Sequence, residues 1–151
     1  ANFIPVWVRN PKYKPPEPTL ETIKVDYYLR GNVYPIADVD SKHRAAYRDT
    51  LSRLAFAAYR SGYGEGTGKG RLYVSSSYRT REEQKRLYEL YRQGLGALAA
   101  PVGKSKHEQG LAVDVPNARI MKGFMKECRK LGLLDDVPSE KWHLTNHQWK
   151  G

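Results

Sequence analysis

The sequence contains a single cysteine, Cys128, among 151 residues, so no disulfide can form within the chain. We therefore expect the fold to be stabilised by packing or by a bound metal. No stretch approaches the roughly 20 consecutive apolar residues that a membrane-spanning helix requires. The first residues also lack a positively charged segment leading into an apolar one, so we expect neither a membrane span nor a retained signal peptide.

Acidic residues are scarce as well. There are 16 Asp and Glu against 26 Lys and Arg, which gives a net charge of +10. Residues 1–40 are neutral overall, residues 41–104 carry +8 and residues 105–151 carry +2. Such an excess favours an anionic partner, although it can equally serve as a solubilising surface. With 40% hydrophobic and 28% charged residues, the composition is that of one soluble globular domain.

Six of the nine prolines lie in residues 1–40. Proline fixes φ and removes a hydrogen-bond donor, so we expect an N-terminal arm with one short strand near 23–29. This arm either packs on the folded domain, residues 41–151, or links it to another module. Apolar residues recur at helical spacing from Ser41 to Arg60 and predict a helix. The five glycines of residues 61–70 predict a flexible loop, because Tyr63 and Gly70 break the pattern of a phosphate-binding loop.

The second half of the chain alternates short strands and helices. A strand is predicted at 71–75, and Thr80 with Glu83 forms a capping box that starts a helix ending near Gly94. Residues 111–115 predict a buried strand, and 141–144 a final one. Asn117 is expected to cap a helix that ends at Gly132 and buries Ile120, Met121, Phe124, Cys128 and Leu131. This pattern predicts an α+β fold: a single domain with a small antiparallel sheet and helices packed against it.

Three segments concentrate polar groups suited to catalysis. In the first, His107 and Asp114 bracket a glycine turn and an apolar strand, which can bring both side chains to one point. In the second, Glu140 precedes His143 by three residues; in a regular strand they would face opposite sides, so the segment must bend for both to reach one site. In the third, a strand end carrying Arg79 leads into the helix of Gln84.

Two imidazoles and one carboxylate leave one open position on a bound zinc ion, as catalytic zinc requires. Water at that position becomes more acidic, and Glu140 is the candidate for accepting its proton. A fixed guanidinium such as Arg79 would orient a substrate carbonyl or carboxylate and stabilise a developing oxyanion. The same ligand set can also hold other divalent ions.

The motif Ser-x-His-x-x-Gly-x-Ala-x-Asp at 105–114, followed by Glu-x-Trp-His at 140–143, resembles the zinc D-alanyl-D-alanine carboxypeptidases and their endopeptidase relatives. That group also includes lysostaphin and the sonic hedgehog N-terminal domain, and the resemblance extends over about 72–145. It implies that Zn²⁺ is bound by His107, Asp114 and His143, that the catalytic residues are Glu140 and Arg79, and that the substrate-binding residues are Gln84, Ser77, Ser105 and Trp142.

Two departures from the family pattern concern the rim of the site. Ser76 replaces a glycine that many members have before Tyr-Arg. After Trp-His the chain continues Leu-Thr-Asn146-His147, where relatives often have another aromatic residue. We interpret His147 as a rim or surface residue, because a fourth protein ligand would displace the catalytic water.

The resemblance implies a zinc metallopeptidase that hydrolyses stem peptides of bacterial peptidoglycan, in the manner of a phage or prophage lysin. One alternative is a D-Ala-D-Ala carboxypeptidase that trims the stem terminus; another is a non-catalytic, zinc-containing module that binds the cell wall. We expect a monomer that acts at the bacterial cell wall, reached by lysis or through a leader outside this sequence. An anionic wall polymer is a second candidate partner. Nucleic-acid binding would rest on charge alone and is not expected.

Overall fold

Helix α3 (Arg44–Arg60) is the main support of the hydrophobic core in the computed structural model, which describes residues 17–151. Its buried face includes Tyr47, Leu51, Leu54, Ala55 and Ala58, the positions that set the helical spacing in the sequence. The predicted helix is therefore confirmed. It begins at Arg44 because residues 41–43 form a turn, with the His43 amide donating to the Asp40 carbonyl.

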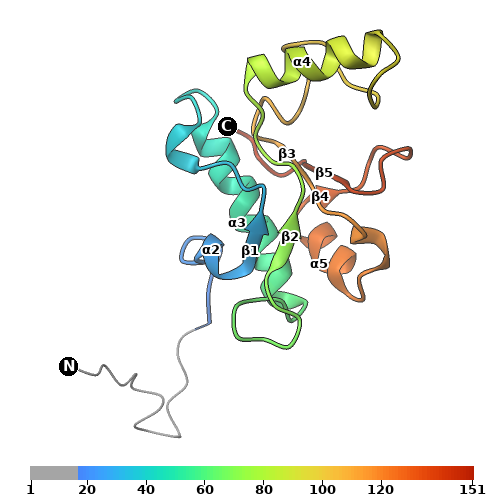
Figure 1. Ribbon diagram of the computed structural model, residues 1–151. Helices are drawn as coiled ribbons and strands as arrows, with labels where there is room; N and C mark the ends of the chain where they lie inside the picture. The colour runs from blue at the N-terminus through green and yellow to red at the C-terminus, as the bar shows by residue number, and fades with distance from the viewer. Residues whose placement is uncertain (1–16) are drawn as a thin grey trace, which may run out of the picture.

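Two small sheets lie in front of α3 (Figure 1). Strands β1 (Leu29–Gly31) and β2 (Leu72–Val74) pair in parallel. Strands β3 (Ala112–Asp114), β5 (His143–Asn146) and β4 (Leu133–Leu134) form an antiparallel sheet in the order β3-β5-β4. An antiparallel bridge between Ser76 and Asp114 joins the edge after β2 to β3. The fold is α+β, as predicted; the parallel β1–β2 pair is an addition to the antiparallel sheet.

The N-terminal part differs from its prediction in detail. Residues expected as a strand form helix α2 (Val25–Tyr28), and β1 starts only at Leu29. A 3-10 helix, η1 (Ile36–Asp38), follows. Ile23, Leu29 and Val39 lie in the core, so residues 17–40 pack on the rest of the protein. Residues 1–16, with four of the six prolines of the expected arm, lie outside the described residues.

The single helix predicted over 117–132 is wrong, because the chain breaks it into two. The 3-10 helix η2 (Ala118–Ile120) is followed by a turn at Gly123, whose φ of +78° is incompatible with a continuing helix, and then by α5 (Phe124–Lys130). Phe124 and Cys128 are buried as expected. Ile120, expected to face inward, is instead 81% exposed.

Helix α4 (Arg81–Arg92) stands at one end of the molecule, apart from both sheets (Figure 1). The N-cap half of the predicted capping box is present: the Thr80 hydroxyl accepts a hydrogen bond from the Glu83 amide, while the Glu83 carboxylate pairs with Arg86. Within α4, which the structure describes in full, Gln84 is the one buried residue. No helix among residues 17–151 is long and apolar enough to cross a bilayer.

Candidate metal centre and active site

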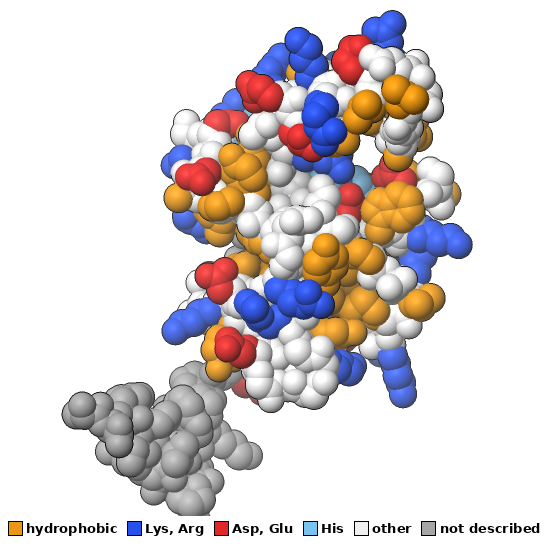
Figure 2. Space-filling model, in the orientation of Figure 1, with side chains coloured by type: hydrophobic (Ala, Val, Ile, Leu, Met, Phe, Trp, Pro, Cys, Tyr) orange, Lys and Arg blue, Asp and Glu red, His pale blue; other side chains and the backbone are white. Residues whose placement is uncertain are grey.

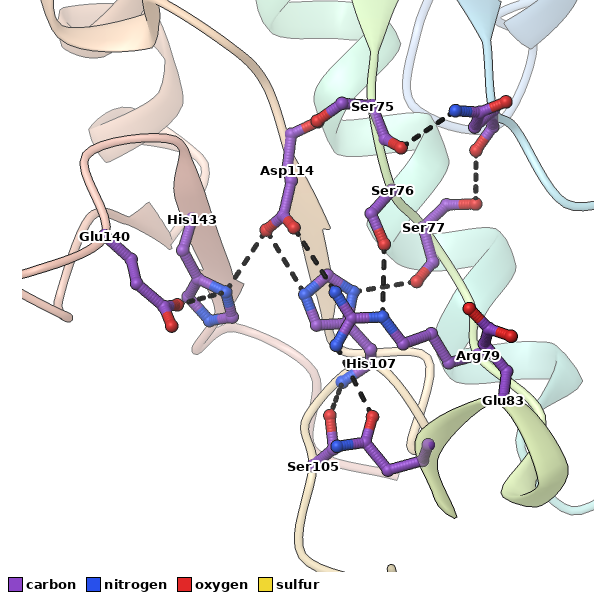
Figure 3. Close-up of polar contacts among 12 residues, drawn as sticks. Ser75, Ser76, Ser77, Arg79, Glu83, Ser105, His107, Asp114, Glu140 and His143 are labelled. Carbon is purple, nitrogen blue, oxygen red and sulfur yellow. Dashed lines mark hydrogen bonds and ion pairs between the residues drawn. The ribbon is translucent and has the colours of Figure 1, made fainter. Parts of the chain in front are cut away.

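His107, Asp114 and His143 converge although they come from different parts of the sequence (Figure 3). Asp114 ends β3 and lies directly across the ladder from His143, the first residue of β5. His107 precedes β3 in a tight turn. The Asp114 Oδ1 atom lies 3.2 Å from His107 Nε2 and 3.3 Å from His143 Nδ1. All three side chains are buried.

The turn that carries His107 is fixed against α3. The Gly110 amide donates to the His107 carbonyl, and Gly110 has a φ of +73° that favours glycine. A Cβ at this position would lie 2.8 Å from the Cβ of Tyr47 and 3.0 Å from its backbone nitrogen. The motif glycine therefore allows the turn to pack directly on α3, which fixes the place from which His107 points.

In each imidazole, one ring nitrogen faces Asp114 and the other forms a hydrogen bond elsewhere. The partner in that hydrogen bond determines whether the nitrogen facing Asp114 carries a proton or a lone pair. His107 Nδ1 lies 2.8 Å from the Ser77 carbonyl, which can only accept, so Nδ1 carries the proton and Nε2 offers a lone pair. His143 Nε2 lies 3.1 Å from the Thr145 hydroxyl, and its Nδ1 faces Asp114. Both imidazoles thus direct a nitrogen toward the same carboxylate oxygen.

This arrangement fits a divalent cation. The three ligand atoms lie within 4.8 Å of one another, and the buried Asp114 Oδ1 has no hydrogen-bond partner. Two neutral imidazole nitrogens and a carboxylate oxygen are all acceptors, so facing one another without a cation would be unfavourable. Burial by itself would raise the pKa of Asp114, but the proximity of both histidine side chains outweighs it and lowers the pKa to about 2. The carboxylate is therefore ionised at neutral pH.

Glu140 reaches the same point through the bend that its spacing from His143 requires. Residues 137–140 form a turn before β5, in which the Glu140 amide donates to the Val137 carbonyl and the His143 amide donates to the Glu140 carbonyl. The Glu140 Oε2 atom lies 3.5 Å from His143 Nδ1. Its side chain is less buried than the three acceptors, so it lies beside them on the solvent side.

Arg79 lies on the other side of Asp114, with Nη2 3.5 Å from Oδ2. Its Nε donates to the Ser76 hydroxyl at 3.2 Å, and its Nη1 lies 3.4 Å from Gln84 Oε1. Gln84, which the resemblance implies is a substrate-binding residue, is completely buried, and its Nε2 donates to the Ala100 carbonyl. In this structure Gln84 therefore supports Arg79 and the segment at Ala100 rather than facing the solvent.

The other expected substrate-binding residues differ in exposure. Ser77 is buried and its hydroxyl donates to the Asn32 carbonyl, so what it offers the site is its own carbonyl to His107. Ser105 is also buried, and its hydroxyl accepts from the His107 amide. Trp142, in contrast, is 42% exposed. His147 directly follows β5 and pairs with Asp136 instead of facing His107, Asp114 and His143.

Two hollows adjoin the site and share Ser75 in their walls. One, of about 430 Å³, is lined by Asp114, Ile120 and Trp142, with the cations Arg119 and Lys141 beside them. The other, of about 440 Å³, is lined by Asn32, Tyr34 and Arg79. Figure 2 shows a histidine surface in the notch beneath the end of the molecule that carries α4. One hollow thus adjoins Asp114 and the other adjoins Arg79.

Comparison with known proteins identifies a family. A family model described as VanY, D-alanyl-D-alanine carboxypeptidase, matches residues 40–130, more than half of the chain. The match includes Arg79, His107 and Asp114 and ends before Glu140 and His143, which the fold brings to the same place. A comparison with curated proteins found no match.

Proposed function

Because the chain belongs to the D-alanyl-D-alanine carboxypeptidase family, we propose that it is a zinc metallopeptidase that hydrolyses peptide bonds in the stem peptides of bacterial peptidoglycan. The observation that carries this proposal is the convergence of three buried acceptors, His107, Asp114 and His143, with Glu140 and Arg79 on either side. A merely structural metal site would have no need of a free carboxylate and a guanidinium at its edge.

His107 Nε2, Asp114 Oδ1 and His143 Nδ1 would hold the metal. Zn²⁺ is the expected ion, because it takes nitrogen and oxygen ligands and in catalytic sites keeps a position free of protein ligands. When bound, it polarises a carbonyl and makes water more acidic at neutral pH.

Glu140 has the position and the chemistry of a general base. It is a carboxylate with solvent access, 3.5 Å from a metal-facing nitrogen, and it can accept the proton of the attacking water and deliver it to the leaving amine. Arg79 carries a permanent positive charge close to the same point and is held by Ser76 and Gln84. It would stabilise the negative charge that develops on the scissile carbonyl, or pair with a terminal carboxylate.

The two hollows, one beside Asp114 and the other beside Arg79, support an endopeptidase that accepts the middle of a peptide. Such an activity, together with the net charge of +10, suits a phage or prophage lysin acting on an anionic wall. The second candidate is a D-Ala-D-Ala carboxypeptidase, which the family description favours. In that case Arg79 would bind the terminal carboxylate of the stem.

A non-catalytic wall-binding module is the alternative from another class. It would retain the metal ligands but gain nothing from a carboxylate beside them. Glu140 therefore argues against it, and so does the retention of Arg79 close to Asp114.

Mass spectrometry of the products released from purified peptidoglycan tests the proposal. The sample is compared with a chelator-treated one and with a chelated one restored with zinc. New termini within the stem or cross-bridge establish an endopeptidase, and loss of a single terminal alanine establishes a carboxypeptidase. If no wall type yields a product that depends on the metal, the proposed activity is wrong and the binding module replaces it.

A further inference from the structure

The side of His143 that faces away from Asp114 leads into a chain of hydrogen bonds. His143 Nε2 lies 3.1 Å from the hydroxyl oxygen of Thr145, which follows two residues later on the same face of β5. The Thr145 hydroxyl donates to Asp136 Oδ1 at 2.9 Å. The other carboxylate oxygen of Asp136 lies 2.6 Å from His147 Nε2. Thr145, Asp136 and His147 are thus connected to His143 by hydrogen bonds.

The direction of this chain follows from what each group can do. A hydroxyl has one proton, and an ionised carboxylate can only accept. Asp136 therefore takes the proton of Thr145, and the Thr145 oxygen remains as an acceptor. His143 must then carry its proton on Nε2, which leaves the lone pair of Nδ1 directed at Asp114. Without Asp136, the Thr145 hydroxyl could rotate and donate to Nε2, which would place the imidazole proton on Nδ1.

The surroundings of Asp136 keep its carboxylate ionised, so that it can only accept hydrogen bonds. Burial would raise the pKa of Asp136, but hydrogen bonds from His147 and Thr145 outweigh it and lower the pKa below its ordinary value. His147 occupies Oδ2, so Oδ1 is left for Thr145. Thr145 is itself buried, so water does not compete for its hydroxyl.

We propose that Asp136 is a positioning residue for the metal centre: acting through the Thr145 hydroxyl, it holds His143 in the Nε2-protonated form and so keeps Nδ1 available as a metal ligand. The zinc part of this proposal rests on the proposed function. The tautomer part does not, because it concerns the metal-free protein. Neither Thr145 nor Asp136 belongs to the motifs by which the sequence resembles the family.

Two measurements test the tautomer of His143 and its effect on zinc binding separately. The first is the tautomer of His143 in the metal-free protein, measured by ¹⁵N NMR at pH 8.5 after selective labelling of the four histidines. The second is the dissociation constant of Zn²⁺, measured by competition with a chromophoric chelator. The variants are Thr145→Val, which keeps the shape but removes the hydroxyl, Thr145→Ser, which keeps the hydroxyl, and Asp136→Asn. The matched control is Asp135→Asn, an equal change of charge at a neighbouring carboxylate that pairs with Arg119 instead.

Wild-type protein and Thr145→Ser should show His143 protonated at Nε2. Thr145→Val should move the proton to Nδ1 and weaken zinc binding about 10- to 100-fold, the usual effect of losing a partner of a metal-binding histidine. Asp136→Asn should lose part of the tautomer preference and weaken zinc binding more than Asp135→Asn does. Since Asp136 is partly exposed, its variant tests the idea even if Thr145→Val fails to fold.

The proposal is overturned if His143 keeps the Nε2 proton in both Thr145→Val and Asp136→Asn, or if Asp135→Asn weakens zinc binding as much as Asp136→Asn. A wild-type protein that binds no zinc would contradict the proposed function instead. In that case the NMR measurement still decides whether Asp136 and Thr145 determine the tautomer.

Discussion

Replacing Glu140 with Gln separates the proton-transfer role of this side chain from the binding of the metal. The variant keeps the size and shape of the side chain and removes its ability to accept a proton. Because Glu140 Oε2 lies 3.5 Å from His143 Nδ1 and outside the set of three acceptors, the ligands themselves stay intact. We therefore expect the protein to retain its metal and to lose turnover.

The size of the loss follows from the role. General base catalysis contributes about 10²- to 10⁴-fold to a rate. This range corresponds to about 3 to 5 kcal/mol in the activation free energy. The loss should appear in kcat with little change in KM, because a group that acts in the transition state adds little to ground-state binding.

The assay measures release of stem-peptide products at saturating zinc, with metal content determined on the same samples. Glu108→Gln is the matched control. It lies next to His107 and is buried, and its Oε1 accepts a hydrogen bond from the Gly103 amide that a glutamine oxygen can also accept. The reasoning is refuted if Glu140→Gln holds zinc and turns over within tenfold of wild type, or if Glu108→Gln loses as much activity.

Three further predictions concern the supports of the site. Gly110→Ala combines a φ of +73° with a Cβ 3.0 Å from the Tyr47 nitrogen, so it should destabilise the protein by about 2 to 5 kcal/mol; an unchanged midpoint in urea would contradict this. Burial is the largest influence on Tyr47 and raises its pKa from 10.0 to about 12, so its contribution to stability is complete below pH 10 and is lost as the pH rises to 12. The loss amounts to about 2 to 3 kcal/mol, and Tyr47→Phe should show a shallower decline over that range in denaturation experiments; an equal decline would exclude Tyr47 as its source. Trp142→Ala removes an exposed ring from the wall of a hollow, so it should raise KM several-fold without changing zinc affinity; an unchanged KM would place the substrate elsewhere.

Local signals in the sequence predicted much of the fold. The N-cap at Thr80 and the apolar spacing of α3 depend on neighbouring residues, and both appear as expected. The break at Gly123 was missed because an apolar spacing from Ile120 to Leu131 is compatible with one helix, and only a positive φ at the glycine shows the interruption. The parallel pairing of Leu29 with Leu72 joins residues far apart in the sequence, which no local pattern encodes.

The motifs predicted that His107, Asp114 and His143 lie close together, and the structure brings the three side chains together. They could not tell which polar residues face solvent and which face inward. Gln84 is an example: its spacing from Arg79 is the same whether its amide binds substrate or, as in the structure, the Ala100 carbonyl. The role of Thr145 was missed because the final strand was predicted only to residue 144, whereas β5 continues to Asn146 and places Thr145 on the face of His143. The role of Asp136 could not be predicted, because its hydrogen bond with Thr145 depends on how β4 and β5 pair.

The most direct test of the account is a crystal structure of the zinc-loaded protein with anomalous diffraction collected on both sides of the zinc absorption edge. The account predicts one zinc peak in contact with His107 Nε2, Asp114 Oδ1 and His143 Nδ1, with Glu140 beside it and no fourth protein ligand. A zinc peak at other residues, or an active protein with no metal among these three side chains, would contradict it.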